Sequence, residues 1–555
     1  MRSSRRRVAR RRPYRERPVT HATPGTSVAL RAGSGAARLL ARLALLAALP
    51  WLTHCATAPS LEGVQPSYAL PPASSPALDT TLRELGDAPG RSTVRLVEQN
   101  TMAFAYRAST AAAAERSLDV QYYIWSDDLT GRLLAIDLMR AAERGVRVRV
   151  LLDDIDARAK HDLFVVADLH PNLEVRIFNP FYSRSGAFGY VTEWLLRSNR
   201  LNRRMHNKSW IVDNRVAIVG GRNIGDEYFG ASEKSNFADL DVLLAGPVVA
   251  EVSAAFDAYW NSPNAVPVSR FEGRPPPPEA LEQLMADARE YRAQASETPY
   301  VEALRDPVRR AEMLANRPPA LTVPDVRLLV DDPDKVGSDV EGPEASNVLT
   351  GLAQAMTGAD DELLVFSAYF VPRKEGRKSL VRQVERGVRV AVLTNSLAAT
   401  DVAAVHTGYA RQRRHLLKGG VELYEMKRAA GSVEGRRQIS VTGSSGASLH
   451  TKAMLIDRRW VFVGSMNLDP RSAFLNTEMG VLIESPALAE QLFGQFERAT
   501  GPALSYRVVL EEHEGLVWYD RVDGQERRLE REPDASAGRR LSVTLLRLVP
   551  LDSQL

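Results

Sequence analysis

Two stretches of the chain place the same reactive side chains at the same spacing. HNKSWIVDNRVAIVGGRN begins at His206, and HTKAMLIDRRWVFVGSMN begins at His450. Each holds a histidine, a lysine two residues later, an aspartate five residues after the lysine, and an asparagine after a glycine turn. An imidazole can act as a nucleophile or move a proton, while an ammonium neutralises anionic oxygens. Such a set, provided twice, suits chemistry on a phosphodiester.

The candidate residues form two equivalent sets. They are His206, Lys208, Asp213 and Asn223 in the first stretch, and His450, Lys452, Asp457 and Asn467 in the second. The segments that begin at each histidine have strand character, and residues two apart on a strand point to the same face. Each histidine therefore projects together with its lysine. No cluster with metal-ligand spacing is evident in the sequence, so we expect these side chains to stabilise charge without a metal or a cofactor.

The chain repeats itself over a longer range than these motifs. ERGVRVRVLLDD at Glu143–Asp154 returns as ERGVRVAVLTNS at Glu385–Ser396, 242 residues later, and the two histidines are 244 residues apart. Two features in the same order at nearly the same offset indicate a duplicated domain. In each half a strand, a helix ending at Gly145 or Gly387, and a second strand follow one another. This order predicts an α/β fold in which helices cover sheets.

The paired pattern H-x-K-x4-D-x6-G-[GS]-x-N resembles the signature of the phospholipase D superfamily, and the resemblance covers roughly residues 95–510. It implies two duplicated phospholipase D-like α-β-α sandwich domains packed as a pseudo-dimer around one active site. It also implies a phosphohistidine intermediate that is resolved by water or an alcohol. Neither copy departs from the core pattern, so we expect an active enzyme.

The resemblance also implies roles for the motif residues. His206 is expected to be the nucleophile, and His450 the general acid that later activates the incoming hydroxyl. The two lysines would hold the phosphate oxygens, and Asn223 and Asn467 would bind substrate beside them. Asp213 and Asp457, counted with the catalytic set, are expected to buttress the site.

Two acidic residues downstream of the motifs complete the expected catalytic set. Glu478 in NTEMG matches an acidic position that orients a catalytic histidine in relatives, and we expect it to serve His450. Aligning ADLDVLLAGP with TEMGVLIESP puts Asp239 at the equivalent place of the first half, where we expect it to serve His206.

Several further stretches narrow the resemblance to bacterial cardiolipin synthases, in particular the cardiolipin synthase C type. They are VQYYIWSDDLTGRLL, NRRMHNKSWIVD, GGRNIGDEYF, NSLAATDVAAVHTGYARQRRHLL and GSMNLDPRSAFLNTEMG. The resemblance implies transfer of a phosphatidyl group from one phospholipid to a hydroxyl of phosphatidylglycerol, with phosphatidylethanolamine as a further candidate substrate. Two alternatives stay open: a phospholipase D-type hydrolase or nuclease, and a non-catalytic phospholipid-binding envelope lipoprotein.

The amino-terminal region has the composition of a targeting segment. An arginine-rich start is followed by LALLAALPWLTHC, whose apolar run of about ten residues suits the core of a signal peptide. The run ends at Cys55, the single cysteine of the chain, in a context that resembles a bacterial lipobox apart from His54. We predict a lipid on Cys55, a membrane-anchored place in the bacterial envelope, and a periplasmic catalytic body. The alternative is an unmodified cysteine behind a simple anchor.

The predicted organisation has six segments. They are a basic leader and signal segment (1–54), the lipidated cysteine and a flexible tether (55–94), the first phospholipase D-like domain (95–270), a Pro-rich and helical insert (271–320), the second phospholipase D-like domain (321–510) and a carboxyl-terminal extension (511–555).

Charge argues against a nucleic-acid partner. The whole chain carries +4, but twelve arginines and one glutamate give residues 1–54 a net charge of +11, so the remaining residues sum to −7. A mildly acidic body does not favour binding to a phosphate backbone.

Two other stretches fit either a membrane surface or packing on the body. Phe178–Arg204 interleaves aromatic residues with five arginines just before the first histidine. The tail RRLSVTLLRLVPLDSQL places Leu541, Leu545 and Leu548 at helical spacing beside arginines. Either stretch suits anionic headgroups and the bilayer interface, and either also suits an ordinary helix that docks on the domain.

Overall fold

The computed structural model describes residues 58–73, 75–86, 90–184, 187–271, 275–337, 346–428, 447–512, 515–522 and 524–546. The chain divides into two compact units, Met1–Cys55 and Ala56–Leu555, and all described residues belong to the second. The predicted leader, Cys55 and the end of the tail lie outside the described residues. Among the described residues, no helix is both long and apolar enough to cross a bilayer.

The first half is built on a nine-stranded sheet. In spatial order its strands are β10 (Leu321–Val323), β1 (Ser92–Val97), β8 (Asp241–Ala245), β6 (Val216–Gly220), β5 (Ser209–Val212), β2 (Ser117–Tyr122), β3 (Arg147–Asp153), β4 (Leu173–Phe178) and β9 (Ala265–Pro267). Strands β2, β3 and β4 pair in parallel, and the other neighbours are antiparallel.

The second half repeats this sheet and extends it. Its ten strands are, in spatial order, β11 (Asp325–Val330), β18 (Met479–Glu484), β17 (Trp460–Gly464), β16 (Lys452–Ile456), β12 (Glu362–Ser367), β13 (Arg389–Asn395), β14 (Glu422–Met426), β19 (Ser505–Glu511), β20 (Gly515–Val522) and β21 (Gln525–Leu529). From β11 to β19 the order matches that from β1 to β9, and β12, β13 and β14 again pair in parallel. The predicted duplication of an α/β domain is confirmed.

The helices fall into three groups along the chain. The first half has α2 (Pro76–Leu85), α3 (Asn100–Ala113), α4 (Leu129–Glu143), α5 (Asp154–Ala157), α6 (His161–Ala167), α7 (Ala187–Leu201), α8 (Asp226–Phe229) and α9 (Val248–Trp260). Next come α10 (Ala280–Ala295), α11 (Pro299–Arg305) and α12 (Pro307–Ala315). The second half has α13 (Asn347–Thr357), α14 (Arg373–Glu385), α15 (Ala403–Lys418), α16 (Pro470–Phe474), α17 (Pro486–Thr500) and α18 (Ala537–Leu546).

Local sequence explains where α4 begins and where α4 and α14 end. The Asp128 side chain accepts a hydrogen bond from the backbone N–H of Gly131 and so caps the start of α4. Just beyond the ends of α4 and α14, Gly145 and Gly387 adopt φ of 90° and 95°, a left-handed conformation that favours glycine. The expected helix ends at these two glycines are confirmed.

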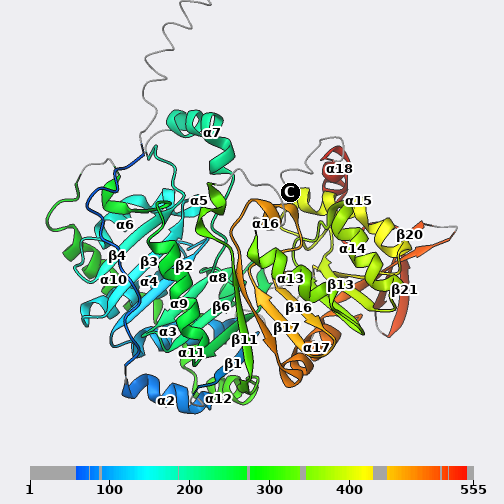
Figure 1. Ribbon diagram of the computed structural model, residues 1–555, viewed down its shortest axis with the longest axis horizontal. Helices are drawn as coiled ribbons and strands as arrows, with labels where there is room; N and C mark the ends of the chain where they lie inside the picture. Colours follow the sequence, from blue (N-terminus) through cyan, green and yellow to red (C-terminus); the bar gives the residue numbers. More distant parts are fainter. Residues whose placement is uncertain are drawn as a thin grey trace, which may run out of the picture. The chain divides into compact units, whose positions relative to one another are not determined.

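The three largest apolar clusters of the described residues hold the layers together. Helices α3 and α4 pack on one face of the first sheet, and α13, α14 and α15 pack on one face of the second. The third core contains residues of both halves, among them Ile211 of β5, Phe256 of α9, Leu455 of β16 and Phe496 of α17. Since both sheets bury apolar side chains in this shared core, the halves form the expected pseudo-dimer, and Figure 1 shows the two sheets side by side.

Candidate active site

Each motif histidine stands just before a central antiparallel strand. Residues after His206 form β5, which pairs with β2, and residues after His450 form β16, which pairs with β12. The Lys208 ammonium donates to the backbone carbonyl of His206 at 2.6 Å, and the Lys452 ammonium donates to that of His450 in the same way. The charge of Lys208 acts on His206 and that of Lys452 acts on His450, so each lysine lies near its histidine as expected. Strand β5 begins only at Ser209, so the predicted strand does not include His206 and Lys208.

The segment around His206 is held by the second half of the chain. The His206 N–H donates to the carbonyl of Thr477 at 2.9 Å, and the Thr477 N–H donates to the carbonyl of Arg204 at 2.9 Å. This pairing puts Glu478 directly against the imidazole, with 2.8 Å between Glu478 Oε2 and His206 Nδ1. The carboxylate that orients the first histidine therefore comes from the second half of the chain.

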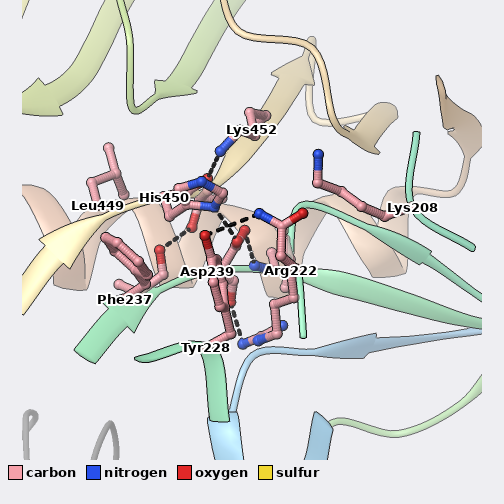
Figure 2. A network of polar contacts seen from close by, with 12 residues as sticks. Lys208, Arg222, Tyr228, Phe237, Asp239, Leu449, His450 and Lys452 are labelled. Atoms are coloured by element: carbon pink, nitrogen blue, oxygen red, sulfur yellow. Dashed lines mark hydrogen bonds and ion pairs between the residues drawn. The ribbon is translucent and has the colours of Figure 1, made fainter. Parts of the chain in front are cut away.

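The segment around His450 is held by the first half in the same manner. Strand β7 (Asn236–Ala238) pairs in parallel with β15 (Ala447–Leu449), and the His450 N–H donates to the carbonyl of Ala238 at 2.8 Å. Asp239 follows β7 directly, and its Oδ2 lies 2.5 Å from His450 Nδ1. In the view of Figure 2, Asp239 lies below the His450 ring, and the ammonium groups of Lys452 and Lys208 lie above it.

The expected pairing of carboxylates with histidines was therefore wrong. Glu478 serves His206 rather than His450, and Asp239 serves His450 rather than His206. Aligning the halves finds equivalent positions, but it does not reveal which half supplies the neighbour of each histidine. The two halves exchange their acidic segments across the interface, so neither half can assemble a complete histidine–carboxylate pair alone.

The two aspartates of the motifs do not reach the site. Asp213 accepts hydrogen bonds from the backbone N–H groups of Glu115, Arg116 and Ser117 at 3.0, 2.8 and 2.7 Å. Asp457 does the same at the equivalent place, accepting from the N–H groups of Asp361 and Glu362 at 2.8 and 3.0 Å.

Both aspartates stand at the far end of their strands, seven residues beyond the histidine in each case, a separation of about 20 Å on an extended chain. Asp213 and Asp457 adopt φ of 50° and 51° in the hairpin turns that begin there. Counting them as catalytic was wrong: they fix the starts of β2 and β12 and support the site only through the sheets.

The two asparagines connect the motifs to neighbouring loops. Asn223 Oδ1 accepts from the N–H of Ile124 at 3.3 Å, while its Nδ2 donates to the Tyr228 hydroxyl at 3.0 Å. Asn467 Oδ1 accepts from the N–H of Tyr369 at 3.2 Å. Asn223 therefore orients the loop that follows β2, and Asn467 the loop that follows β12. Substrate contact by either asparagine stays a prediction.

Aromatic rings that the sequence reading missed pack against both histidines. Tyr123 meets His206 edge to face at a ring-centre distance of 5.0 Å. Tyr228 and Phe237 pack on His450 at 5.2 and 5.0 Å. These rings fix the imidazole planes and keep water from them. Tyr123 lies at the end of an apolar-aromatic strand, which is the one signal that could have pointed to it.

Burial and the repulsion between neighbouring positive charges lower the pKa values of the histidines and lysines of the site. Burial, then the charges of Lys208, Lys452 and His450, lower the pKa of His206 well below its usual value. Burial also lowers the pKa of both lysines, although the carboxylates of Glu478 and Asp239 oppose the effect. Because the two histidines and the two lysines influence one another's protonation, the four groups belong to one site.

The two carboxylates differ although their positions are equivalent. Burial raises the pKa of Glu478 to about 7, against the opposing charge of Lys208 and a hydrogen bond from Ser465. For Asp239, burial acts in the same direction, but the charge and hydrogen bond of His450 and the charges of Lys452 and Arg222 outweigh it and lower the pKa. The site is therefore asymmetric: Glu478 exchanges a proton near neutral pH, whereas Asp239 stays ionised.

A serine-for-glycine difference between the motifs accompanies this asymmetry. The Ser465 hydroxyl donates to Glu478 Oε2, and the hydroxyl oxygen itself accepts from the Met479 N–H at 3.0 Å. The equivalent residue of the first half is Gly221, where an added Cβ would lie 2.2 Å from Asp239 Oδ1. The first motif therefore requires glycine at this turn because the aspartate occupies the space.

Two arginines that the sequence reading also missed border the site. Arg471 of α16 donates to the side chain and the carbonyl of Asn202 at 2.9 and 2.7 Å, and its charge contributes to lowering the pKa of His206. Arg222 donates to the carbonyl of Asp239 and to that of Val97. Both tie segments of the site to the surrounding fold.

Comparisons with known proteins identify the family of the chain. A family model described as a cardiolipin synthase, phospholipase D-like domain matches residues 109–260 and 352–500. Cardiolipin synthase C of Escherichia coli (strain K12) is 42% identical over 469 residues, which cover 84% of this chain and 96% of that protein. Cardiolipin synthase B of the same strain is 26% identical over 390 residues, covering 70% of this chain and 76% of that protein.

A solved structure supports the fold. The crystal structure of phosphatidylserine synthase from Haemophilus influenzae Rd KW20 has a TM-score of 0.52 with this chain at 13% identity, and it covers 87% of this chain and 100% of that one. Since the family model matches both halves and the fold gathers both motifs at one site, the chain belongs to the phospholipase D-like cardiolipin synthase family.

Proposed function

We propose that the chain transfers a phosphatidyl group from one phospholipid to a hydroxyl of phosphatidylglycerol and so makes cardiolipin. The observation that carries this proposal is the exchange of acidic segments, which gives one site two oriented histidines and two lysines. The chain is similar to Cardiolipin synthase C over 96% of that protein, and this similarity favours a phospholipid as the acceptor.

The reaction takes place in two displacements at phosphorus. In the first, His206 Nε2 forms a bond to phosphorus, the bond from phosphorus to the headgroup oxygen breaks, and His450 gives that oxygen its proton. In the second, His450 takes the proton of the acceptor hydroxyl, whose oxygen bonds to phosphorus as the phosphorus–nitrogen bond breaks. The chain is thereby returned to its starting protonation state.

The asymmetry of the carboxylates supports this division of roles. A nucleophilic imidazole must be neutral, and the pKa of His206 is lowered well below its usual value by burial and by the nearby lysines. A general acid must hold a proton, and His450 lies against the ionised Asp239, which opposes the lowering of its pKa by burial and Lys452. Hydrogen bonds at Nδ1 leave Nε2 of each ring for the chemistry.

The remaining polar groups would stabilise charge on the phosphate. Lys208 and Lys452 place two ammonium groups beside the histidines, and such groups act strongly where water is excluded. Asn223 and Asn467 would bind substrate through the loops that they orient. In this scheme the chain's own side chains supply the charge that the phosphorane-like transition state requires.

The location and partners form part of the same proposal. The apolar run that ends at Cys55 supports a lipid anchor there, with the catalytic body in the periplasm and facing phospholipid. Mass spectrometry of the mature protein should find acyl chains on Cys55 at its amino terminus. An uncleaved leader, or an unmodified cysteine, would remove the anchor from the proposal.

Lipid analysis of the purified protein tests the activity. Incubation with phosphatidylglycerol, with and without phosphatidylethanolamine, should yield cardiolipin. His206→Ala and His450→Ala should each abolish it, while His415→Ala, which alters an exposed histidine of α15, should not. Phosphatidic acid as the main product would instead indicate a hydrolase. Lipid binding without turnover would indicate a non-catalytic lipoprotein, and cleavage of nucleic acid would indicate a nuclease.

A further inference from the structure

Two helices far apart in the sequence present large apolar side chains to solvent. On α7, Val191, Leu195 and Leu196 are 51%, 73% and 61% exposed. On α18, Leu541 and Leu545 are 59% and 55% exposed. Single exposed leucines are ordinary, but the spacing of four residues puts Val191 beside Leu195 on one face of α7, and Leu541 beside Leu545 on one face of α18. We call these five residues the rim patch.

Both parts of the rim patch lie at the edge of the sheets that carries the histidines. Helix α7 follows the carboxyl end of β4, and it ends at Leu201, five residues before His206. In Figure 1, α7 and α18 both stand at the upper edge of the described fold, above the ends of the parallel strands.

Helix α18 is connected to the site through the loop after β13. Its inward side chain, Val543, packs on Leu397, and Arg539 donates to the carbonyl of Thr400. The adjacent Asp401 carboxylate is close enough to Lys452 to oppose the lowering of that lysine's pKa by burial. The outward leucines of α18 therefore stand over the His450 side of the site, as α7 stands over the His206 side.

Cationic groups accompany the apolar stripes on both helices. Beside α7, Arg197 and Arg200 share the carboxylate of Glu193, and the Arg158 guanidinium lies 4.8 Å from the centre of the Tyr190 ring. Beside α18, Arg428 is exposed and close enough to Arg539 for their charges to repel. Apolar side chains flanked by arginines match the interface of an anionic bilayer, where acyl chains lie beneath charged headgroups.

We propose that the rim patch docks the catalytic edge of the protein onto the surface of an anionic phospholipid bilayer. This inference rests on the proposed function, because a phosphatidyl donor and acceptor both reside in the bilayer. Docking by α7 and α18 brings the two sides of the site to the headgroups at once, so a phospholipid can reach His206 without leaving the membrane entirely.

Paired substitutions test the patch against a matched control in the same chain. Leu195→Glu with Leu196→Glu alters α7, and Leu541→Glu with Leu545→Glu alters α18. The control, Val308→Glu with Leu314→Glu, alters two exposed residues of α12, which are 66% and 43% exposed and lie at the opposite edge in Figure 1. All six positions are on the surface, so the fold should persist, and circular dichroism checks this.

The first readout compares two forms of one substrate in the full-length protein. Cardiolipin formation is measured on phosphatidylglycerol vesicles and on the same lipid dispersed in detergent micelles. Either rim variant should lose about tenfold or more on vesicles and less than about twofold in micelles, since burying each leucine contributes a large apolar area. The control should match the wild type in both. An unchanged vesicle rate, or equal losses in both forms, would overturn the proposal.

The second readout detects docking without turnover. A polarity-sensitive dye is attached to Leu195→Cys in a Cys55→Ser background, so that the dye reports α7 alone. Vesicles containing phosphatidylglycerol should shift its emission to the blue, and phosphatidylcholine vesicles should shift it less. Because the dye stands on the patch itself, turnover is measured on the unlabelled wild type. A dye shift together with a wild type that forms no cardiolipin on vesicles or in micelles would refute the proposed function and keep the docking surface. Absence of any shift, or burial of the dye by self-association seen in sedimentation, would refute the docking surface.

Discussion

The contrast between Glu478 and Asp239 gives a prediction with a defined sign. Glu478 has a pKa of about 7 in the fold against its ordinary value of 4.5, so at neutral pH its ionisation opposes folding. Each pH unit between these two values lowers the free energy of unfolding by about 1.4 kcal/mol, which gives about 3 kcal/mol over the whole interval. Below pH 4.5 Glu478 is protonated in both the folded and the unfolded chain, and the fold has its full stability. The free energy of unfolding then falls as pH rises from 4.5 to about 7.

The perturbation is Glu478→Gln, which removes the titration and keeps the shape. Relative to the wild type, the variant should gain about 3 kcal/mol in free energy of unfolding between pH 4.5 and pH 7, with no further change above. Any hydrogen bond that the glutamine cannot make shifts the stability of the variant by a constant and does not alter this pH dependence. Turnover should nevertheless fall by about 10²–10⁴-fold, because His206 loses the group that orients it.

Asp239→Asn provides the matched comparison. The pKa of Asp239 is lowered, because the charge of His450 and its hydrogen bond outweigh burial, so its ionised form favours folding above the ordinary value of 3.8. The variant should be less stable than the wild type at neutral pH, and the deficit should shrink as pH falls below 3.8. Denaturant unfolding over about pH 3–8 measures both variants. Stability differences that run parallel in the two variants would refute the assigned asymmetry.

Three further substitutions examine the supports of the site. Asp213→Ala leaves the backbone N–H groups of residues 115–117 without their acceptor, so it should lower the free energy of unfolding by about 1–3 kcal/mol. Turnover of the folded enzyme should stay within severalfold of the wild type. A loss of turnover in a variant that unfolds at the same denaturant concentration as the wild type would return Asp213 to the catalytic set. Gly221→Ser should impair turnover far more than Ser465→Gly, because its Cβ would lie 2.2 Å from Asp239 Oδ1, and equal kinetics in the two variants would contradict the close approach.

Repetition and spacing in the sequence predict the duplicated fold. Two copies of one motif, a second repeat at nearly the same offset, and helix ends at Gly145 and Gly387 lead directly to a duplicated α/β fold, and each corresponds to an observed feature. The spacing of two residues also led to the expectation that each histidine lies near its lysine, although His206 and Lys208 stand just before β5 rather than on it. These features are local, so one segment of sequence is enough to read them.

The errors concern contacts between segments far apart in the chain. Glu478 and His206 are 272 residues apart, and only the pairing of backbone segments across the interface decides that they meet. Asp213 lies within the motif, yet the length of β5 carries it to the other end of the sheet. Tyr228 and Phe237 pack on His450 of the other half, and no periodicity in the sequence predicts this contact.

Trapping the covalent intermediate tests the central claim most directly. Labelled phospholipid is mixed with enzyme, the reaction is quenched within milliseconds in alkali, and the protein is digested with trypsin. Trypsin releases His206 in MHNK and His450 in QISVTGSSGASLHTK, so the two sites are distinct by mass. We predict a phosphatidyl adduct on the peptide with His206, formed and consumed at the rate of turnover. An adduct on the peptide with His450 would reverse the roles, and turnover without any adduct would contradict the phosphohistidine mechanism.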